Sequence, residues 1–229
     1  MLIAISQRQD RNKHGNWFDN LDSAYAKYLE KFGINILPLP NSPKHLDYYF
    51  KELPIKGVIL SSGNDVNPKL YGSKYKSESV SSERDSAERK ILEISIKGKL
   101  PVLGLCRGMQ FINVFFGGKL VLIKQDTKSK IEHVAFNHEI KIVEKNAKKL
   151  IGSAFDANSF HNCGISQGTL SKKLRAFATS EDGLIEGIYH PKLPIAGIMW
   201  HPERKSPNDI VNKKIVQAFL NKKLFWKDG

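Results

Sequence analysis

Hydrophobic residues follow two alternating patterns along the first half of the chain. Apolar runs of strand length occur at residues 2–6, 34–39, 57–62 and 101–106. Between them, apolar side chains recur every three or four residues, as on one face of a helix. One such helix is predicted from Asp19 or Asn20 to Gly33, and a second from Ser82 to Gly98. This alternation predicts strand–helix–strand units around a parallel sheet.

The second half has a different pattern, in which short apolar runs are separated by turns. Strands are predicted at residues 119–123, 138–143, 174–179, 185–190 and 195–200. A last helix is predicted from Ser206-Pro207 through about Leu224, because proline favours the first helical position. No repeat or linker divides the chain, so we expect a single domain over residues 1–229. The expected fold class is α/β, a mostly parallel sheet flanked by helices with an added antiparallel portion in the second half.

The composition excludes disordered and membrane-spanning classes. The chain has 229 residues, of which 41% are hydrophobic and 26% charged, as in an ordinary globular protein. No apolar run approaches the 18 or so residues of a membrane span, so we expect no membrane partner. Cys106 and Cys163 are too few for a disulfide framework, and residues 1–5 are too short for a signal peptide. These features predict a cytoplasmic protein with reduced thiols.

The chain is strongly basic, with 36 basic and 23 acidic residues and a net charge of +13. Most of the basic residues are lysine, whereas base and bidentate phosphate recognition favours arginine. We therefore expect no nucleic-acid partner. Two interpretations remain open: a solvated, lysine-rich surface, or a positive field that attracts a small anionic substrate.

The first candidate for chemistry is Cys106, at the centre of a G-x-C-x-G sequence (residues 104–108). It ends a predicted strand and precedes a predicted helix over residues 109–116. This is the thiol form of a nucleophile elbow, in which a sharp turn exposes the central side chain beside a helix N-terminus. The alternative is a small buried core cysteine.

A thiol nucleophile needs a base, and the base needs a residue that orients it. His201 and Glu203 follow the predicted strand at 195–200, two positions apart, so that their side chains can point the same way. A turn histidine with a solvated glutamate is the alternative. The loop after the strand at 57–62 holds Gly63 and Asn64, whose backbone N–H groups could form an oxyanion hole with that of Arg107. An ordinary turn is the alternative there.

Four stretches of the sequence resemble the class I glutamine amidotransferase family, in its γ-glutamyl hydrolase-like branch. They are residues 57–72, 84–120, 159–165 and 197–204, and the GLCRGMQ and HPE motifs are specific in combination. The resemblance implies a flavodoxin-like α/β fold with a triad of Cys106 (nucleophile), His201 (base) and Glu203 (orienter). It further implies that Gln110 helps to hold a γ-glutamyl group. Ser62-Gly63 replaces a Gly-Gly pair frequent in the family, so the identity of the oxyanion donors stays open. In a second departure, Asn162-Cys163 stands where the family commonly has polar residues such as His-Gln.

The function implied by the resemblance is hydrolysis of γ-glutamyl amides through a thioester, releasing glutamate. The excess of basic over acidic residues favours a small anionic leaving group, an amine or a phosphoramidate such as that of γ-glutamyl-CDP-amidate. The latter substrate would place the chain in capsule biosynthesis. The alternatives are hydrolysis of γ-glutamyl-GABA, a glutaminase subunit supplying ammonia to a separate synthetase partner, and a non-enzymatic interaction protein.

Several charged or ligating residues complete the set of candidates. Arg8, in the loop after the first strand, could contact an anionic leaving group, and His161, near the expected site, could bind substrate or donate a hydrogen bond. We expect no cofactor. We also expect no metal, because only His133 and His138 lie close together in the sequence and no cluster has ligand spacing.

Overall fold

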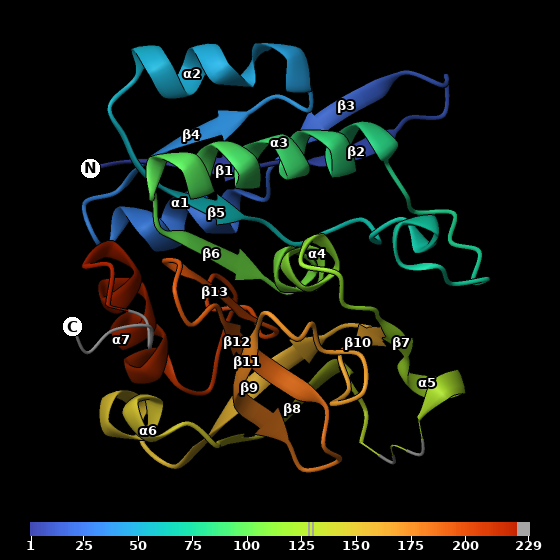
Figure 1. Cartoon of the computed structure of the whole chain (residues 1–229), viewed down its shortest axis with the longest axis vertical. Helices are drawn as coiled ribbons and strands as arrows, with labels where there is room; N and C mark the ends of the chain where they lie inside the picture. Colours follow the sequence, from blue (N-terminus) through green and yellow to red (C-terminus); the bar gives the residue numbers. More distant parts are fainter. Residues whose placement is uncertain (128, 130, 224–229) are drawn as a thin grey trace.

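The computed structural model describes residues 1–127, 129 and 131–223. One nine-stranded sheet runs through both halves of the chain (Figure 1). Its strands, in spatial order, are β4 (Asn35–Leu39), β1 (Leu2–Ser6), β5 (Ile55–Leu60), β6 (Val102–Leu105), β13 (Ile195–Ile198), β12 (Ile185–Tyr189), β11 (Arg175–Ser180), β8 (Val134–Ile142) and β9 (Ala154–Phe160). The pairs from β4 to β13 are parallel, and those from β13 to β9 are antiparallel. The predicted fold class is therefore confirmed.

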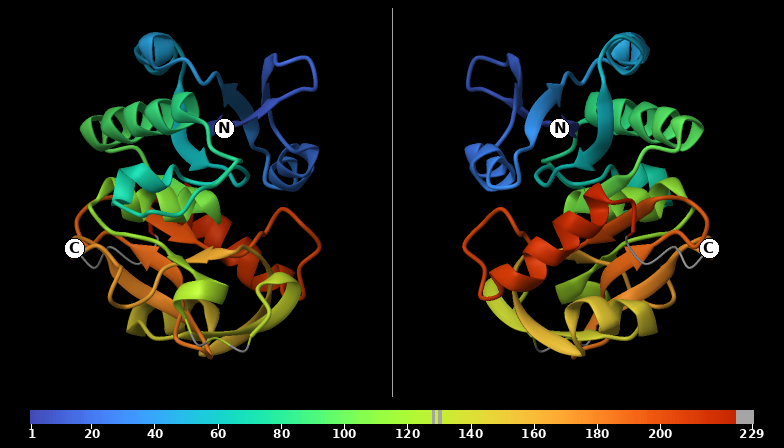
Figure 2. Two further views of the ribbon diagram at one scale, coloured as in Figure 1. Left: turned by 90° about the vertical axis from the view of Figure 1, so that its right-hand side faces the viewer. Right: turned by 90° about the vertical axis from the view of Figure 1, so that its left-hand side faces the viewer.

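Helices cover both faces of the sheet (Figure 2). One core cluster contains side chains of α1 (Ser23–Glu30), α6 (Lys145–Ile151) and α7 (Asp209–Leu220). The other contains side chains of α2 (Leu46–Glu52), α3 (Ser82–Gly98) and α4 (Arg107–Phe115). The strands supply both clusters, because successive side chains of a strand point to opposite faces. In β1, Ile3 and Ile5 join the first cluster and Ala4 joins the second.

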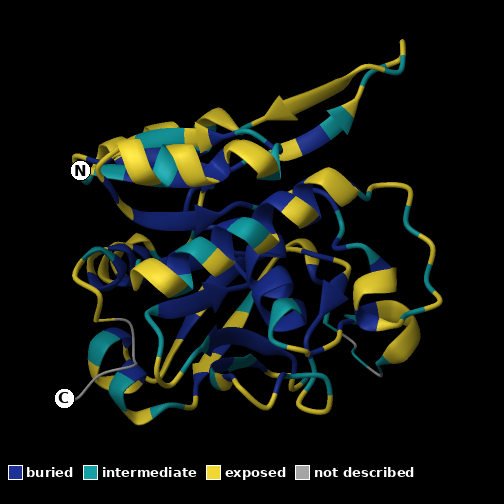
Figure 3. Ribbon diagram, turned by 45° about the horizontal axis from the view of Figure 1, so that its top comes forward, coloured by how far each residue is buried: buried dark blue, intermediate teal, exposed yellow. Residues whose placement is uncertain are grey.

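Several elements have too few regularly spaced apolar residues to be predicted from the sequence. The loop expected after the first strand is a hairpin of β2 (Arg8–Arg11) and β3 (Trp17–Asn20), which extends beyond the sheet and is exposed along β3 (Figure 3). The helices α2 and α6 are seven residues each and bury one and two side chains. The edge strand β9 contains buried polar residues whose hydrogen bonds are satisfied within the protein. A search for hydrophobic periodicity does not detect such a strand.

Some predicted boundaries were wrong because a different residue caps the helix. Asp22 caps α1 by accepting from Ala24 N–H, whereas Asp19 instead holds Asn41. Asn208 caps α7, so the last helix starts after Pro207, and its predicted end at residue 224 lies outside the described residues. The strand predicted at 119–123 shortens to β7 (Val121–Leu122), paired with β10 (Cys163–Gly164) and followed by α5 (Ile123–Asp126).

Two short 3-10 helices, η1 (Pro43–His45) and η2 (Pro68–Tyr71), complete the described elements. Among the helices of this part of the chain, none has both the length and the apolar character needed to cross a bilayer.

Candidate active site

Cys106 occupies a strained turn between β6 and α4. Its φ is +49° and its ψ is −102°, a conformation that costs a residue with a Cβ about 1–3 kcal/mol. Its N–H donates to Ile198 O at 2.8 Å, which ties the turn to the end of β13. The residue is the N-cap of α4, where the positive end of the helix favours a negative charge.

The elbow closes only because glycine stands on both sides of Cys106. A Cβ on Gly108 would lie 2.2 Å from Leu60 O, and a Cβ on Gly104 would lie 2.6 Å from the carbonyl carbon of Gly108. These neighbours are backbone atoms, which cannot rotate away as a side chain can. The glycines therefore set how closely α4 approaches β5 and β6.

His201 and Glu203 lie just beyond the end of β13 and are both buried. His201 Nδ1 and Glu203 Oε1 are 2.7 Å apart, so the carboxylate accepts the Nδ1–H and fixes the ring. The edge of the Phe160 ring packs against the imidazole, with the ring centroids 5.5 Å apart. The second ring nitrogen, Nε2, is buried and has no regular hydrogen-bond partner among residues 1–127, 129 and 131–223.

Cys106 and Glu203 both act on the charge of the His201 imidazole. Burial lowers the pKa of the imidazole, but the interactions with Cys106 and with the Glu203 carboxylate outweigh burial and raise the pKa of His201 to about 9. At neutral pH the ring is thus protonated beside the sulfur. The side chains of Cys106, His201 and Glu203 therefore meet at the carboxyl ends of β6 and β13.

Asn158, in β9, holds the backbone at His201, a role that the sequence did not reveal. Its Oδ1 accepts from His201 N–H at 2.8 Å, and its Nδ2 donates to His201 O at 2.9 Å and to Lys205 O at 3.0 Å. Asn158 is buried. No local motif marks this residue, because its partners lie more than 40 positions away in the chain.

The candidate oxyanion loop follows β5. Gly63 has a φ of +107°, and a Cβ there would lie 2.9 Å from the Cβ of Arg8. The Asn64 side chain bonds the Gln9 backbone through both of its polar atoms, at 2.9 Å each. Asn64 could therefore serve an oxyanion hole only through its backbone. Arg107 is the first residue of α4, and its N–H belongs to the group that an α-helix leaves without an intrahelical acceptor.

A buried charge network connects that loop to the elbow. Arg84 donates to Ser61 O at 2.8 Å and to Glu88 Oε1 at 2.9 Å, and the Arg107 guanidinium pairs with Glu88 and Asp85. Burial raises the pKa of the Glu88 carboxyl, but Arg107 and Arg84 outweigh it and hold that pKa below its usual value. In the sequence, this network is marked only by the i, i+4 spacing of Arg84 and Glu88. The same spacing is common on solvated helices, so it does not predict a buried network.

Of the three predicted substrate-binding residues, Gln110 and His161 contact the same backbone oxygen, and Arg8 lies apart from them on β2. Gln110 Nε2 donates to Cys163 O at 2.8 Å, and His161 Nδ1 lies 3.0 Å from the same oxygen. His161 Nε2 faces Glu186 Oε1 at 3.7 Å. Arg8 lies on β2 beside Gly63, is half-exposed, and pairs with Asp10 at 2.7 Å.

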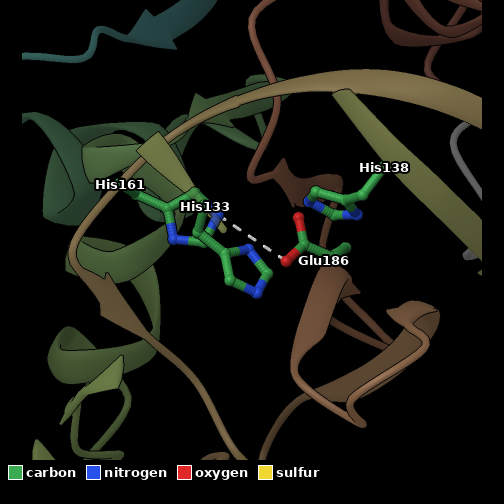
Figure 4. A group of neighbouring side chains, drawn as sticks. All are labelled: His133, His138, His161 and Glu186. Carbon is green, nitrogen blue, oxygen red and sulfur yellow. Dashed lines mark ion pairs between the residues drawn. The ribbon is translucent and has the colours of Figure 1, made fainter. Parts of the chain in front are cut away.

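The described residues also contain a group that could hold a metal ion. It consists of His133, His138, His161 and Glu186, whose candidate ligand atoms all lie within 4.8 Å of one another (Figure 4). The expectation of no metal rested on sequence spacing, which does not register residues brought together by β8, β9 and β12.

Comparisons with known proteins agree on one family. The peptidase C26 family model matches residues 1–203. The γ-glutamyl-CDP-amidate hydrolase of Campylobacter jejuni is 34% identical over 187 residues, covering 82% of this chain and 80% of that protein. The γ-glutamyl-γ-aminobutyrate hydrolase of Escherichia coli O157:H7 is 28% identical over 236 residues, covering 96% and 92%. A solved glutamine amidotransferase from Thermotoga maritima has the same fold, with a TM-score of 0.58 at 16% identity over 96% of this chain and 82% of that one.

Proposed function

The chain belongs to the peptidase C26 family of class I glutamine amidotransferase-like proteins and is a hydrolase of γ-glutamyl amides, and from this premise we propose that Cys106 is its nucleophile and a γ-glutamyl-CDP-amidate its substrate. The observation that carries the proposal is the strained Cys106 beside a His201 ring that is bound by Glu203 and whose pKa is raised to about 9. A thiolate with an imidazolium partner is the reactive form of a cysteine nucleophile.

In the proposed reaction the Cys106 sulfur attacks the δ-carbonyl carbon of the γ-glutamyl group. The C–N bond of the tetrahedral intermediate then breaks, and the leaving nitrogen takes the proton held on His201 Nε2. Neutral His201 next removes a proton from water, which attacks the γ-glutamyl thioester. Glutamate leaves, and the Cys106–His201 ion pair is restored.

Backbone N–H groups would stabilise the negative oxygen of the tetrahedral intermediate. Arg107 N–H at the start of α4 is one candidate donor, and the turn at Gly63 and Asn64 supplies the other. Loss of one such donor typically costs about 10²–10³ in rate. The Arg84–Glu88–Arg107 network holds the two donors at a fixed separation, because it bonds both the loop and the elbow.

The nucleotide leaving group is favoured by a cleft that adjoins the oxyanion loop. Arg11, Trp17 and Asn64 line it, together with Gln9, Asp10 and residues 78–80. Trp17 is 50% exposed, and the Arg11 guanidinium lies 5.8 Å from its ring centroid. An exposed aromatic ring can stack on a base, and nearby arginines can bind phosphates. A γ-aminobutyrate leaving group has a carboxylate that an arginine could bind, but it has no ring that could stack on Trp17.

Glutamate release from three substrates tests the proposal. Purified protein is incubated with γ-glutamyl-CDP-amidate, γ-glutamyl-GABA and glutamine. We expect the highest kcat/KM with the nucleotide. Preference for glutamine would instead indicate a subunit that supplies ammonia to a synthetase, and preference for γ-glutamyl-GABA would overturn the nucleotide assignment alone.

A matched pair of variants tests the cleft. Base stacking contributes about 1–3 kcal/mol, so Trp17→Ala should raise KM for the nucleotide substrate roughly 5- to 150-fold. Phe18→Ala is the control, because Phe18 is equally exposed on β3 but does not line the cleft. Equal effects of the two variants would contradict the stacking role of Trp17.

A further inference from the structure

The antiparallel half of the sheet holds a second cluster of ligating side chains that the proposed hydrolysis does not use. His133 precedes β8, His138 lies in β8, His161 follows β9, and Glu186 lies in β12. Glu186, His133 and His161 are 1%, 2% and 4% exposed, and the Nε2 atom of His138 is out of contact with solvent. In Figure 4 the rings of His133 and His161 lie on one side of the Glu186 carboxylate and that of His138 on the other.

Each histidine is oriented by an oxygen atom on its far side. Asp182 Oδ2 lies 2.9 Å from His133 Nε2, Glu139 O lies 3.2 Å from His138 Nδ1, and Cys163 O lies 3.0 Å from His161 Nδ1. These oxygens can only accept, so each must receive the ring N–H. The other nitrogen of each ring then has a bare lone pair, which is how histidine ligands of metal ions are held.

Three of the four inward-facing atoms lack a hydrogen-bond partner among the described residues. His138 Nε2, His161 Nε2 and Glu186 Oε1 are buried with no hydrogen-bond partner in this part of the chain. His133 Nδ1 has only a long contact of 3.5 Å with Ser159, whose hydroxyl also lies within donating distance of His133 O. Several acceptors thus converge on one small volume. Such an arrangement is unfavourable unless a cation or a set of protons is shared among them.

We propose that His133, His138, His161 and Glu186 bind a divalent transition-metal ion, Zn²⁺ being the best match. Three imidazole nitrogens and one carboxylate oxygen supply the four ligands of a tetrahedral zinc site. In a tetrahedron with bonds of about 2.0–2.1 Å the ligand atoms lie roughly 3.3 Å apart. The 3.7 Å between His161 Nε2 and Glu186 Oε1 is close to that value, and the widest separation in the group requires the side chains to move inward.

The site has a structural role rather than a catalytic one. Protein atoms fill all four positions, which leaves none for water or substrate. The ion joins β12 to the edge pair β8–β9 across the intervening β11. Because β9 also carries Asn158, which holds His201, the ion fixes the strand that supports the proposed base. A surface pocket lined by His133 and His161 gives the ion a route inward.

Metal binding can be measured without any assay of hydrolysis. The full chain is stripped with a chelator and titrated with Zn²⁺ against a competing indicator, and with Co²⁺ while the visible spectrum is recorded. We expect one equivalent per chain, intense tetrahedral d–d bands with Co²⁺, and a higher Tm in the presence of Zn²⁺. No binding at micromolar free Zn²⁺ would overturn the proposal and would indicate a proton-sharing network of the same residues.

Variants assign the ion to these residues. His138→Ala and Glu186→Gln should weaken Zn²⁺ binding at least tenfold and abolish the rise in Tm. The two changes put folding at risk in different ways. His138→Ala truncates a side chain that is only half-buried, whereas Glu186→Gln keeps the shape of a buried side chain. His45→Ala, at an exposed histidine outside the cluster, is the control and should bind as the wild type does. Wild-type affinity in both cluster variants would place the ion elsewhere and refute the site.

Discussion

Asn158 offers the sharpest test of how the fold positions the proposed base. The Asn158→Ala substitution removes three hydrogen bonds, one from His201 N–H and one each to His201 O and Lys205 O. A buried hydrogen bond contributes about 1 kcal/mol net, so the three together amount to about 3 kcal/mol. The value is a lower limit, since the His201 N–H and C=O groups left unpaired are buried and each costs about 1–3 kcal/mol, whereas Lys205 is exposed and its carbonyl can bond to water.

The assay is urea unfolding at constant pH, with the m-value unchanged, together with steady-state kinetics. Without the three Asn158 hydrogen bonds the His201 backbone can shift. We expect kcat to fall more than KM rises, because a misplaced proton donor impairs the reaction more than it impairs substrate binding. Asn158→Asp should not rescue either property, because a carboxylate lacks the Nδ2 donors and faces two carbonyl oxygens.

Asn137→Ala is the matched control. Asn137 is directly opposite Asn158 in the β8–β9 pairing, but its side chain is exposed. We expect this change to stay within about 0.5 kcal/mol of wild type. A cost of less than about 1 kcal/mol for Asn158→Ala, with kcat unchanged, would contradict the role assigned to Asn158.

Four further predictions concern the elbow and the ion pair. Cys106→Ala should abolish glutamate release with little change in the urea midpoint; a rate comparable to wild type would refute the nucleophile. Glu203→Gln should lose less kcat than His201→Ala, because orienting the ring contributes less than moving the proton; the reverse ranking would contradict these roles. The pKa of His201 is about 9 when folded and about 6.5 when unfolded, so its contribution to stability should be complete below pH ~6.5 and disappear as pH rises through about 9. Urea unfolding at both pH values measures this loss, which should be absent in His201→Ala. Gly108→Ala should lower the unfolding free energy by about 1–3 kcal/mol or more, because its Cβ would lie 2.2 Å from Leu60 O; a wild-type Tm would show that the elbow can relax.

The parallel half of the fold was predictable because its signals are local. Strands such as residues 2–6 and 101–106 are continuously apolar, as expected where helices cover both faces. The helix from Ser82 to Gly98 carries its own N-terminal and C-terminal signals and was placed correctly. By contrast, β9 and the β2–β3 hairpin bury few apolar side chains, so hydrophobic periodicity could not find them.

The sequence alone determined which residue types are available for chemistry and where the sharp turn at Cys106 falls, because glycine spacing and strand-to-helix transitions act over a few residues. Only the tertiary structure decided which distant groups meet. It brought Asn158 to the backbone of His201 and the Arg84 network under the elbow, and it gathered His133, His138, His161 and Glu186 from positions in or next to β8, β9 and β12. Contacts of this kind depend on strand order and register, which are set by the packing of the whole sheet, and no short stretch of sequence encodes them.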